Sequence, residues 1–113
     1  MNQDRPKVIW QAESTHPAMA DSAREALREV VDPEIGLNII ELGLIRDLQI
    51  ADDRANLLMI MTTPFCPYGP ALLEMARQQA ERAVQRPTTI EVGMEMWDPS
   101  MMEEGAGAEW GLF

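Results

Sequence analysis

An apolar run that stops at two threonines and is followed by three prolines constrains this chain more than any other stretch. Residues 57–61 are apolar at every position, as expected for a strand that is buried on both faces. Residues 62–70 read Thr-Thr-Pro-Phe-Cys-Pro-Tyr-Gly-Pro. Beyond them, apolar residues return with helical spacing at Leu72, Leu73, Ala76, Ala80, Ala83 and Val84. The pattern predicts a strand, a turn and a helix, with the only cysteine, Cys66, in the turn.

A cysteine beside a helix start has a distinct chemistry. Backbone N–H groups and the helix dipole favour negative charge there, so the pKa of a thiol can be lowered. Pro67 suits the first helical position, with Cys66 as N-cap, and Pro70 suits it equally, which would place Cys66 a few residues before the helix. The structural alternative is that Cys66 is a small buried apolar side chain. One cysteine allows neither an internal disulfide nor a four-thiolate site within one chain, so a cluster would need ligands from elsewhere.

The other patterns predict a compact single domain of the α/β (α+β) type, with the order α-β-β-α-β. Residues 22–25 resemble a capping box and open a first helix that ends near Val31. Strands over 44–51 and 55–63 should form an antiparallel hairpin. A helix from about 68 to 86 and a strand over 90–96, with alternating apolar residues, follow. A short C-terminal helical segment completes the order.

The helices and the last strand each have one apolar face. We therefore expect a small sheet with both long helices on one face, and a partly wet opposite face. Residues 1–19 are predicted to form a mobile leader, or to pack loosely through Trp10, ahead of a domain over residues 20–113.

The loop over residues 32–43 is both acidic and apolar. Its apolar residues from Leu37 to Leu42 must pack onto the domain, and its polar residues are candidates for the wall of a pocket: Asp32, Glu34, Asn38 and Glu41. For each of them, helix capping and turn chemistry is the alternative role.

The charge of the chain limits its partners. Nine basic and nineteen acidic residues give a net charge of −10, which argues against nucleic acid. No apolar run approaches the ~18 residues of a membrane span, and residues 1–20 lack the apolar core of a signal peptide. We expect a cytoplasmic protein that contacts neither nucleic acid nor membrane.

Several segments together resemble one family. They are Asp32-Pro33-Glu34-Ile35, Leu42-Gly43-Leu44-Ile45, Thr62-Thr63-Pro64-Phe65-Cys66-Pro67, Trp97-Asp98-Pro99 and Glu103-Glu104. This set resembles the small metal-sulfur cluster assembly factors of the SufT and PaaD type. The resemblance implies a compact α/β domain, a reactive Cys66, and a pocket lined by Asp32, Glu34, Thr62 and Thr63, to which the loop argument adds Asn38. The chain lacks the cysteine-bearing extension common in the PaaD branch, which favours the SufT-like side.

The leading hypothesis is a non-enzymatic accessory factor in iron-sulfur protein maturation. Cys66 would hold iron or a cluster transiently, with further ligands shared between two subunits of a homodimer, and pass it between an assembly scaffold and a client protein. Three alternatives stay open: a thiol-dependent enzyme with Cys66 as nucleophile, a PaaD-like accessory protein of a phenylacetyl-coenzyme A oxygenase, and a pure protein-interaction module.

Overall fold

The structure of the chain is a computed structural model that describes residues 9–62 and 67–102. Three strands form one mixed sheet in the order β1 (Ile45–Ile50), β2 (Ala55–Met59) and β3 (Thr88–Val92). Strands β1 and β2 are antiparallel, which confirms the predicted hairpin, and β2 and β3 are parallel. The parallel pair is joined by the long helix α3 (Gly69–Val84), the usual crossover for such a pair.

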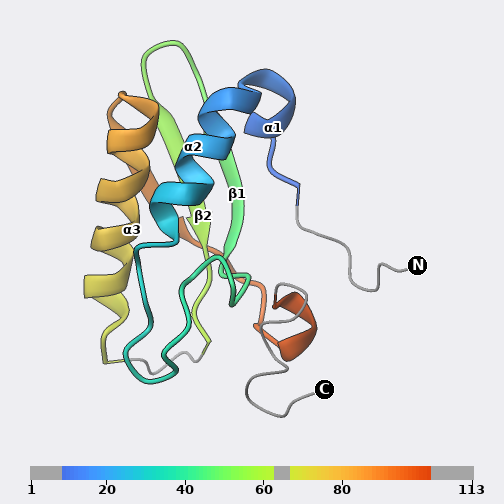
Figure 1. Ribbon diagram of the computed structural model, residues 1–113, viewed down its shortest axis with the longest axis vertical. Helices are drawn as coiled ribbons and strands as arrows, with labels where there is room; N and C mark the ends of the chain where they lie inside the picture. The colour runs from blue at the N-terminus through green and yellow to red at the C-terminus, as the bar shows by residue number, and fades with distance from the viewer. Residues whose placement is uncertain (1–8, 63–66, 103–113) are drawn as a thin grey trace.

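Two helices cover one face of this sheet. Helix α2 (Pro17–Leu27) lies side by side with α3 in front of the strands (Figure 1), and the two pack against each other. The buried side of α3 consists of small and aliphatic residues at helical spacing, as predicted: Leu72, Ala76, Ala80 and Val84. Alanines allow the helix to approach the sheet closely. Because α3 follows β2 in the chain, its first turn lies near the end of the sheet where β2 finishes (Figure 1).

The alternation along β2 separates the two faces of the sheet. Ala55, Leu57 and Met59 are buried, whereas the intervening residues are half-buried. On the open face, the Asn56 side-chain amide donates to Glu91 Oε1 at 2.9 Å. The two helices on one face, and the polar pair on the other, confirm the predicted α+β domain with a partly wet open face.

The first long helix begins earlier than predicted. It starts at Pro17 rather than at Ser22, so the predicted capping box was wrong, and Ser22 is an exposed residue inside α2. Proline suits a first helical position because its missing N–H would have no partner there. The helix ends at Leu27, where Val30 N donates to Leu27 O at 3.1 Å in a tight turn.

Residues 9–19 lie within the stretch predicted to be a leader. They contain α1 (Ala12–Thr15) and the first residues of α2, and Trp10 is only 1% exposed. The boundary expected at residue 20 therefore falls inside a helix, while residues 1–8 lie outside the described part of the chain.

The last strand is displaced from its predicted position. It runs over Thr88–Val92 rather than 90–96, because its partner β2 ends at Met59 opposite Val92. The predicted buried face was also wrong at its second half, since Val92, Met94 and Met96 are 56%, 96% and 82% exposed. After β3, the chain forms the 3-10 helix η1 (Pro99–Met101), close to the predicted helical segment.

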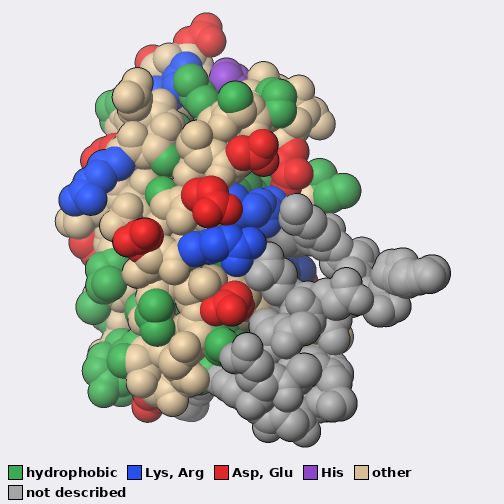
Figure 2. Space-filling model, viewed as in Figure 1, with side chains coloured by type: hydrophobic (Ala, Val, Ile, Leu, Met, Phe, Trp, Pro, Cys, Tyr) green, Lys and Arg blue, Asp and Glu red, His purple; other side chains and the backbone are tan. Residues whose placement is uncertain are grey.

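The surface of the two-helix face carries both charge signs. Acidic and basic side chains are interspersed on this face (Figure 2). None of the helices in the described ranges is long and apolar enough to cross a membrane.

Candidate functional site

Three segments meet at the end of the sheet where β2 finishes. They are the loop between α2 and β1, residues 60–62 after β2, and the start of α3 (Figure 1). The loop is tied to the sheet because Ile60 N donates to Leu44 O at 2.8 Å. The half-buried Met61 reaches toward α3, where its Cε lies 4.0 Å from the position a Cβ would take on Gly69. This end of the domain is the candidate site.

The loop from residue 32 to 43 is fixed by its apolar residues, as predicted. Leu37, Ile39, Ile40 and Leu42 are all buried in the main core. A bridge between Val31 and Asn38 closes the base of the loop. Buried anchors of this kind hold the polar residues between them in fixed positions.

Asp32 is the most unusual of those polar residues, because its side chain is ionisable and yet it is 1% exposed. Its Oδ1 accepts a hydrogen bond from Glu34 N at 2.9 Å, and its carbonyl accepts from Gly36 N at 2.7 Å. Burying a carboxylate is unfavourable unless hydrogen bonds compensate, so this turn holds the group in one orientation. Glu34 itself is exposed.

Asn38 and Glu41 form a reciprocal cap. The Asn38 side-chain oxygen accepts from Ile40 N at 3.0 Å and from Glu41 N at 2.8 Å. In return, Glu41 Oε1 accepts from Asn38 N at 2.9 Å. For these two residues the turn-chemistry alternative describes what the side chains do, and the role of Asn38 in a pocket stays a prediction.

The other predicted site residues follow β2. Thr62 is half-buried at the end of the described segment, whereas Thr63 and Cys66 lie outside the described residues. Helix α3 has Tyr68 as N-cap and Pro70 in its first turn, so Cys66 precedes the N-cap by two positions in the sequence. The structure thus favours the second of the two helix starts considered, and the pocket around Cys66 stays a prediction.

Potential metal ligands are not grouped in the described part of the chain. Within residues 9–62 and 67–102 there is no group of three or more histidine, cysteine and acidic side chains placed to hold a metal ion. The only histidine, His16, lies at the junction of α1 and α2 with its Nδ1 2.9 Å from Thr15 Oγ1. The described residues on their own therefore do not form a metal site.

The segment after β3 supports the site loop, and this contact was not predicted from the sequence. Trp97 Nε1 donates to Leu42 O at 2.7 Å, and Arg46 Nη1 donates to Gly43 O at 3.0 Å. The Arg46 side chain also pairs with Glu95 at 3.0 Å. A tryptophan followed by an Asp-Pro turn was the only available sign that this segment returns to the domain.

Asp98 starts η1 as a capping residue. Its Oδ1 accepts from the backbone N of Ser100 at 2.7 Å and from the Ser100 hydroxyl. These hydrogen bonds, the hydroxyl's first, lower the pKa of the Asp98 carboxyl. The charged form is thereby favoured, which suits an N-cap position.

Comparisons with known proteins agree on one family and one fold. A family model described as an iron-sulfur cluster assembly protein matches residues 20–93. The Fe-S protein maturation auxiliary factor YitW of Bacillus subtilis is 30% identical over 84 residues, covering 73% of this chain and 79% of the relative. An Fe-S protein maturation auxiliary factor of Porphyromonas gingivalis is 34% identical over 90 residues, covering 76% and 85%. The crystal structure of a domain of unknown function, DUF59, from Bacillus anthracis has a TM-score of 0.77 at 23% identity, covering 88% of this chain and 98% of that one, and shows the shared fold.

Proposed function

Because this chain belongs to the iron-sulfur cluster assembly protein family, we propose that it is an accessory factor in the assembly or delivery of iron-sulfur clusters. The observation that carries the proposal is the position of Cys66, inside the matched residues 20–93 and between β2 and α3. Cysteine thiolates bind iron and are the usual ligands of iron-sulfur clusters. The loop that meets the end of β2 and the start of α3 (Figure 1) contains Asp32, which is buried.

The single cysteine makes the proposed binding transient. A cluster usually takes four thiolate ligands, and one chain supplies one. The remaining ligands would come from a second copy, an assembly scaffold or the client protein, so the cluster is cargo and is easily released. We also propose that the role is non-enzymatic, because the relatives are named auxiliary factors.

Anaerobic reconstitution tests this proposal. The purified protein is incubated with ferrous iron, sulfide and a thiol reductant, then desalted, and its absorption spectrum is compared with those of Cys66→Ala and Ser22→Ala. Ser22 is an exposed position on α2 and serves as the control for substitution itself. We expect a visible charge-transfer band in the wild type and in Ser22→Ala, and its loss in Cys66→Ala.

Transfer provides the second readout. The reconstituted protein is mixed with an apo ferredoxin in the presence of a chelator, and holo ferredoxin is followed by circular dichroism. A wild-type protein that gains no visible band, or a band that Cys66→Ala keeps, would contradict the role of Cys66 as carrier ligand.

A further inference from the structure

The two edges of the sheet differ in how they are protected. At the β1 edge, Trp10 Nε1 donates to Ile45 O at 3.3 Å, and Gln11 N donates to Asp47 Oδ1 at 2.8 Å. The register of β1 also shifts between Ile45 and Asp47. A covering segment and a bulge both keep a sheet edge from pairing with another strand.

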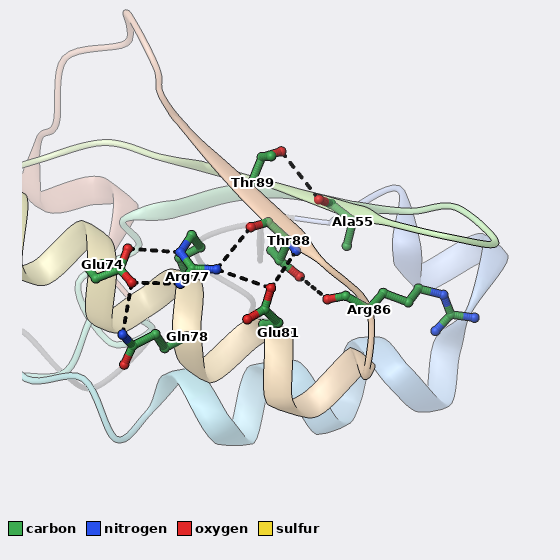
Figure 3. Close-up of polar contacts among 8 residues, drawn as sticks. All are labelled: Ala55, Glu74, Arg77, Gln78, Glu81, Arg86, Thr88 and Thr89. Carbon is green, nitrogen blue, oxygen red and sulfur yellow. Dashed lines mark hydrogen bonds and ion pairs between the residues drawn. The ribbon is translucent and has the colours of Figure 1, made fainter.

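Within the part of the chain that the structure describes, the β3 edge is protected at one end only. Ladder bonds to β2 use odd-numbered positions, since Pro87 O accepts from Ala55 N at 2.9 Å and Gly93 N donates to Met59 O at 2.8 Å. The even-numbered residues therefore direct their backbone groups outward. Those of Thr88 are occupied by α3, because Thr88 N donates to Glu81 Oε2 at 3.0 Å and Thr88 O accepts from Arg77 Nη1 at 3.3 Å (Figure 3).

Beyond Thr88 this protection ends. Among the described residues, none forms a hydrogen bond with the outward backbone groups of Ile90 and Val92. Val92, Met94 and Met96 expose apolar side chains in the same stretch, at 56%, 96% and 82%. The alternating pattern over 90–96 is that of a longer strand, whereas β3 ends at Val92 and the chain bends at Met94.

We propose that a second copy of this chain pairs with the open part of β3. The two β3 strands would run antiparallel about a twofold axis at Val92, so that Ile90 lies opposite Met94 of the second copy. The Arg77 and Glu81 side chains on Thr88 stop the ladder at each end. The three-stranded sheets of both copies would then form one continuous sheet.

Charge selects this register. With the axis at Val92, Glu91 lies opposite Gly93 of the second copy, and no acidic residue of the paired segment faces another. An axis at residue 91 would place Glu91 opposite its own copy, and an axis at residue 93 would carry the pairing past the bend at Met94 to Glu95, whose side chain is held by Arg46. Like charges directly opposite each other destabilise a strand pair.

The ladder is short, so we expect a weak dimer. Each copy carries a net charge of −10, which opposes association and is screened by salt. Dimerisation should therefore increase with ionic strength. This inference does not involve Cys66, so its outcome is separate from that of cluster binding.

Sedimentation velocity on the full chain, in reducing buffer and over a range of protein and salt concentrations, tests the proposal. We expect a monomer–dimer equilibrium that shifts toward the dimer as the protein concentration and the salt concentration rise. Val92→Pro should remain monomeric, because the N–H it removes points outward and takes no part in the β2–β3 ladder. Its thermal unfolding curve checks that the monomer is still folded.

A charge substitution gives a second, milder test. Met94→Lys alters a side chain that is 96% exposed in the monomer, so the fold should be unaffected, and it should weaken dimerisation at least about tenfold. Met75→Lys makes the same change at an exposed methionine of α3 and serves as the matched control. Amide hydrogen exchange at Val92 should slow as the wild-type protein is concentrated.

Two results would overturn the inference. A chain that stays monomeric at every concentration and salt level leaves this edge without a second copy. If Val92→Pro and Met94→Lys still dimerise like the wild type, the dimer uses another surface. The same holds if Met75→Lys weakens dimerisation as much as Met94→Lys does.

Discussion

At the scale of single residues, Gly43 joins the candidate-site loop to the C-terminal segment. Its φ is +74°, and a Cβ there would overlap the carbonyl oxygen of Met101 and lie 2.8 Å from its carbonyl carbon. Gly36, in the same loop, has a similar φ of +83° but nothing within 4 Å of its Cβ position. Substitutions at the two glycines therefore distinguish two costs: the left-handed backbone conformation, which both positions share, and the close packing, which only Gly43 has.

We expect Gly36→Ala to lower the free energy of unfolding by about 1–2 kcal/mol, the usual cost of a left-handed alanine. Gly43→Ala should cost clearly more, because the backbone of Met101 must move as well. Urea unfolding curves of both variants measure the difference. Equal losses would mean that the segment around Met101 yields freely and does not hold the loop in place.

Some of the site residues were predictable from the sequence because their signals are local. Asp32 was identified by an Asp-Pro pair in an acidic turn, and the capping roles of Asn38 and Glu41 depend on residues at most three positions away. Gly43 was not identified as a packing position, because its contact with Met101 joins residues far apart in the chain. Burial of Asp32 likewise depends on tertiary packing, which no local pattern encodes.

At the scale of elements, α3 carries a charged network on its outer side. Arg77 donates to both carboxylate oxygens of Glu74, at 2.9 and 2.7 Å, and Gln78 donates to one of them at 2.9 Å (Figure 3). The Arg77 hydrogen bond, then that of Gln78, lowers the pKa of Glu74 from 4.5 to about 2. Since the folded-state pKa is the lower one, the stabilisation is present above about pH 4.5 and is lost as the pH falls toward 2.

We therefore expect Glu74→Gln to lower the melting temperature slightly at neutral pH and to have a smaller effect near pH 3. High salt should reduce the effect too, because the Glu74 side chain is half exposed. Glu25→Gln on α2 is the control, since Glu25 lies 3.6 Å from Arg28 and its side chain is 79% exposed. A melting-temperature difference for Glu74→Gln that stays constant between pH 7 and 3 would contradict the assigned pKa.

The elements also show what limits prediction from sequence. The hairpin and α3 were placed nearly correctly, because turn residues and helical periodicity are local signals. Strand β3 was displaced because its length is set by β2, which ends opposite Val92 although the alternating pattern continues. The start of α2 was misplaced because Pro17 and the capping pattern at Ser22 both suit a helix start, and packing of the earlier turn on the domain decides between them.

At the scale of the whole molecule, residues 10–15 pack against both β1 and α2. The Arg24 guanidinium lies 4.0 Å from the centre of the Trp10 ring. Glu13 Oε2 accepts from Arg24 at 2.6 Å and from Trp10 N at 3.1 Å. A buried indole combined with a cation–π contact and a partly buried ion pair is an anchor of the domain. This segment lies before the family match, which begins at residue 20.

We predict that Trp10→Ala lowers the free energy of unfolding by about 3–5 kcal/mol, the cost of emptying a large core position. The loss should appear as a shift of a single cooperative transition, since Trp10 belongs to the same core cluster as Leu27, Leu48 and Leu57. Ile9→Ala is the matched control: Ile9 is the preceding residue but is 75% exposed, so its loss should stay within about 0.5 kcal/mol. Urea unfolding followed by far-UV circular dichroism measures both. If Trp10→Ala lost no more than Ile9→Ala, residues 10–15 would be an appendage and the domain would begin within α2.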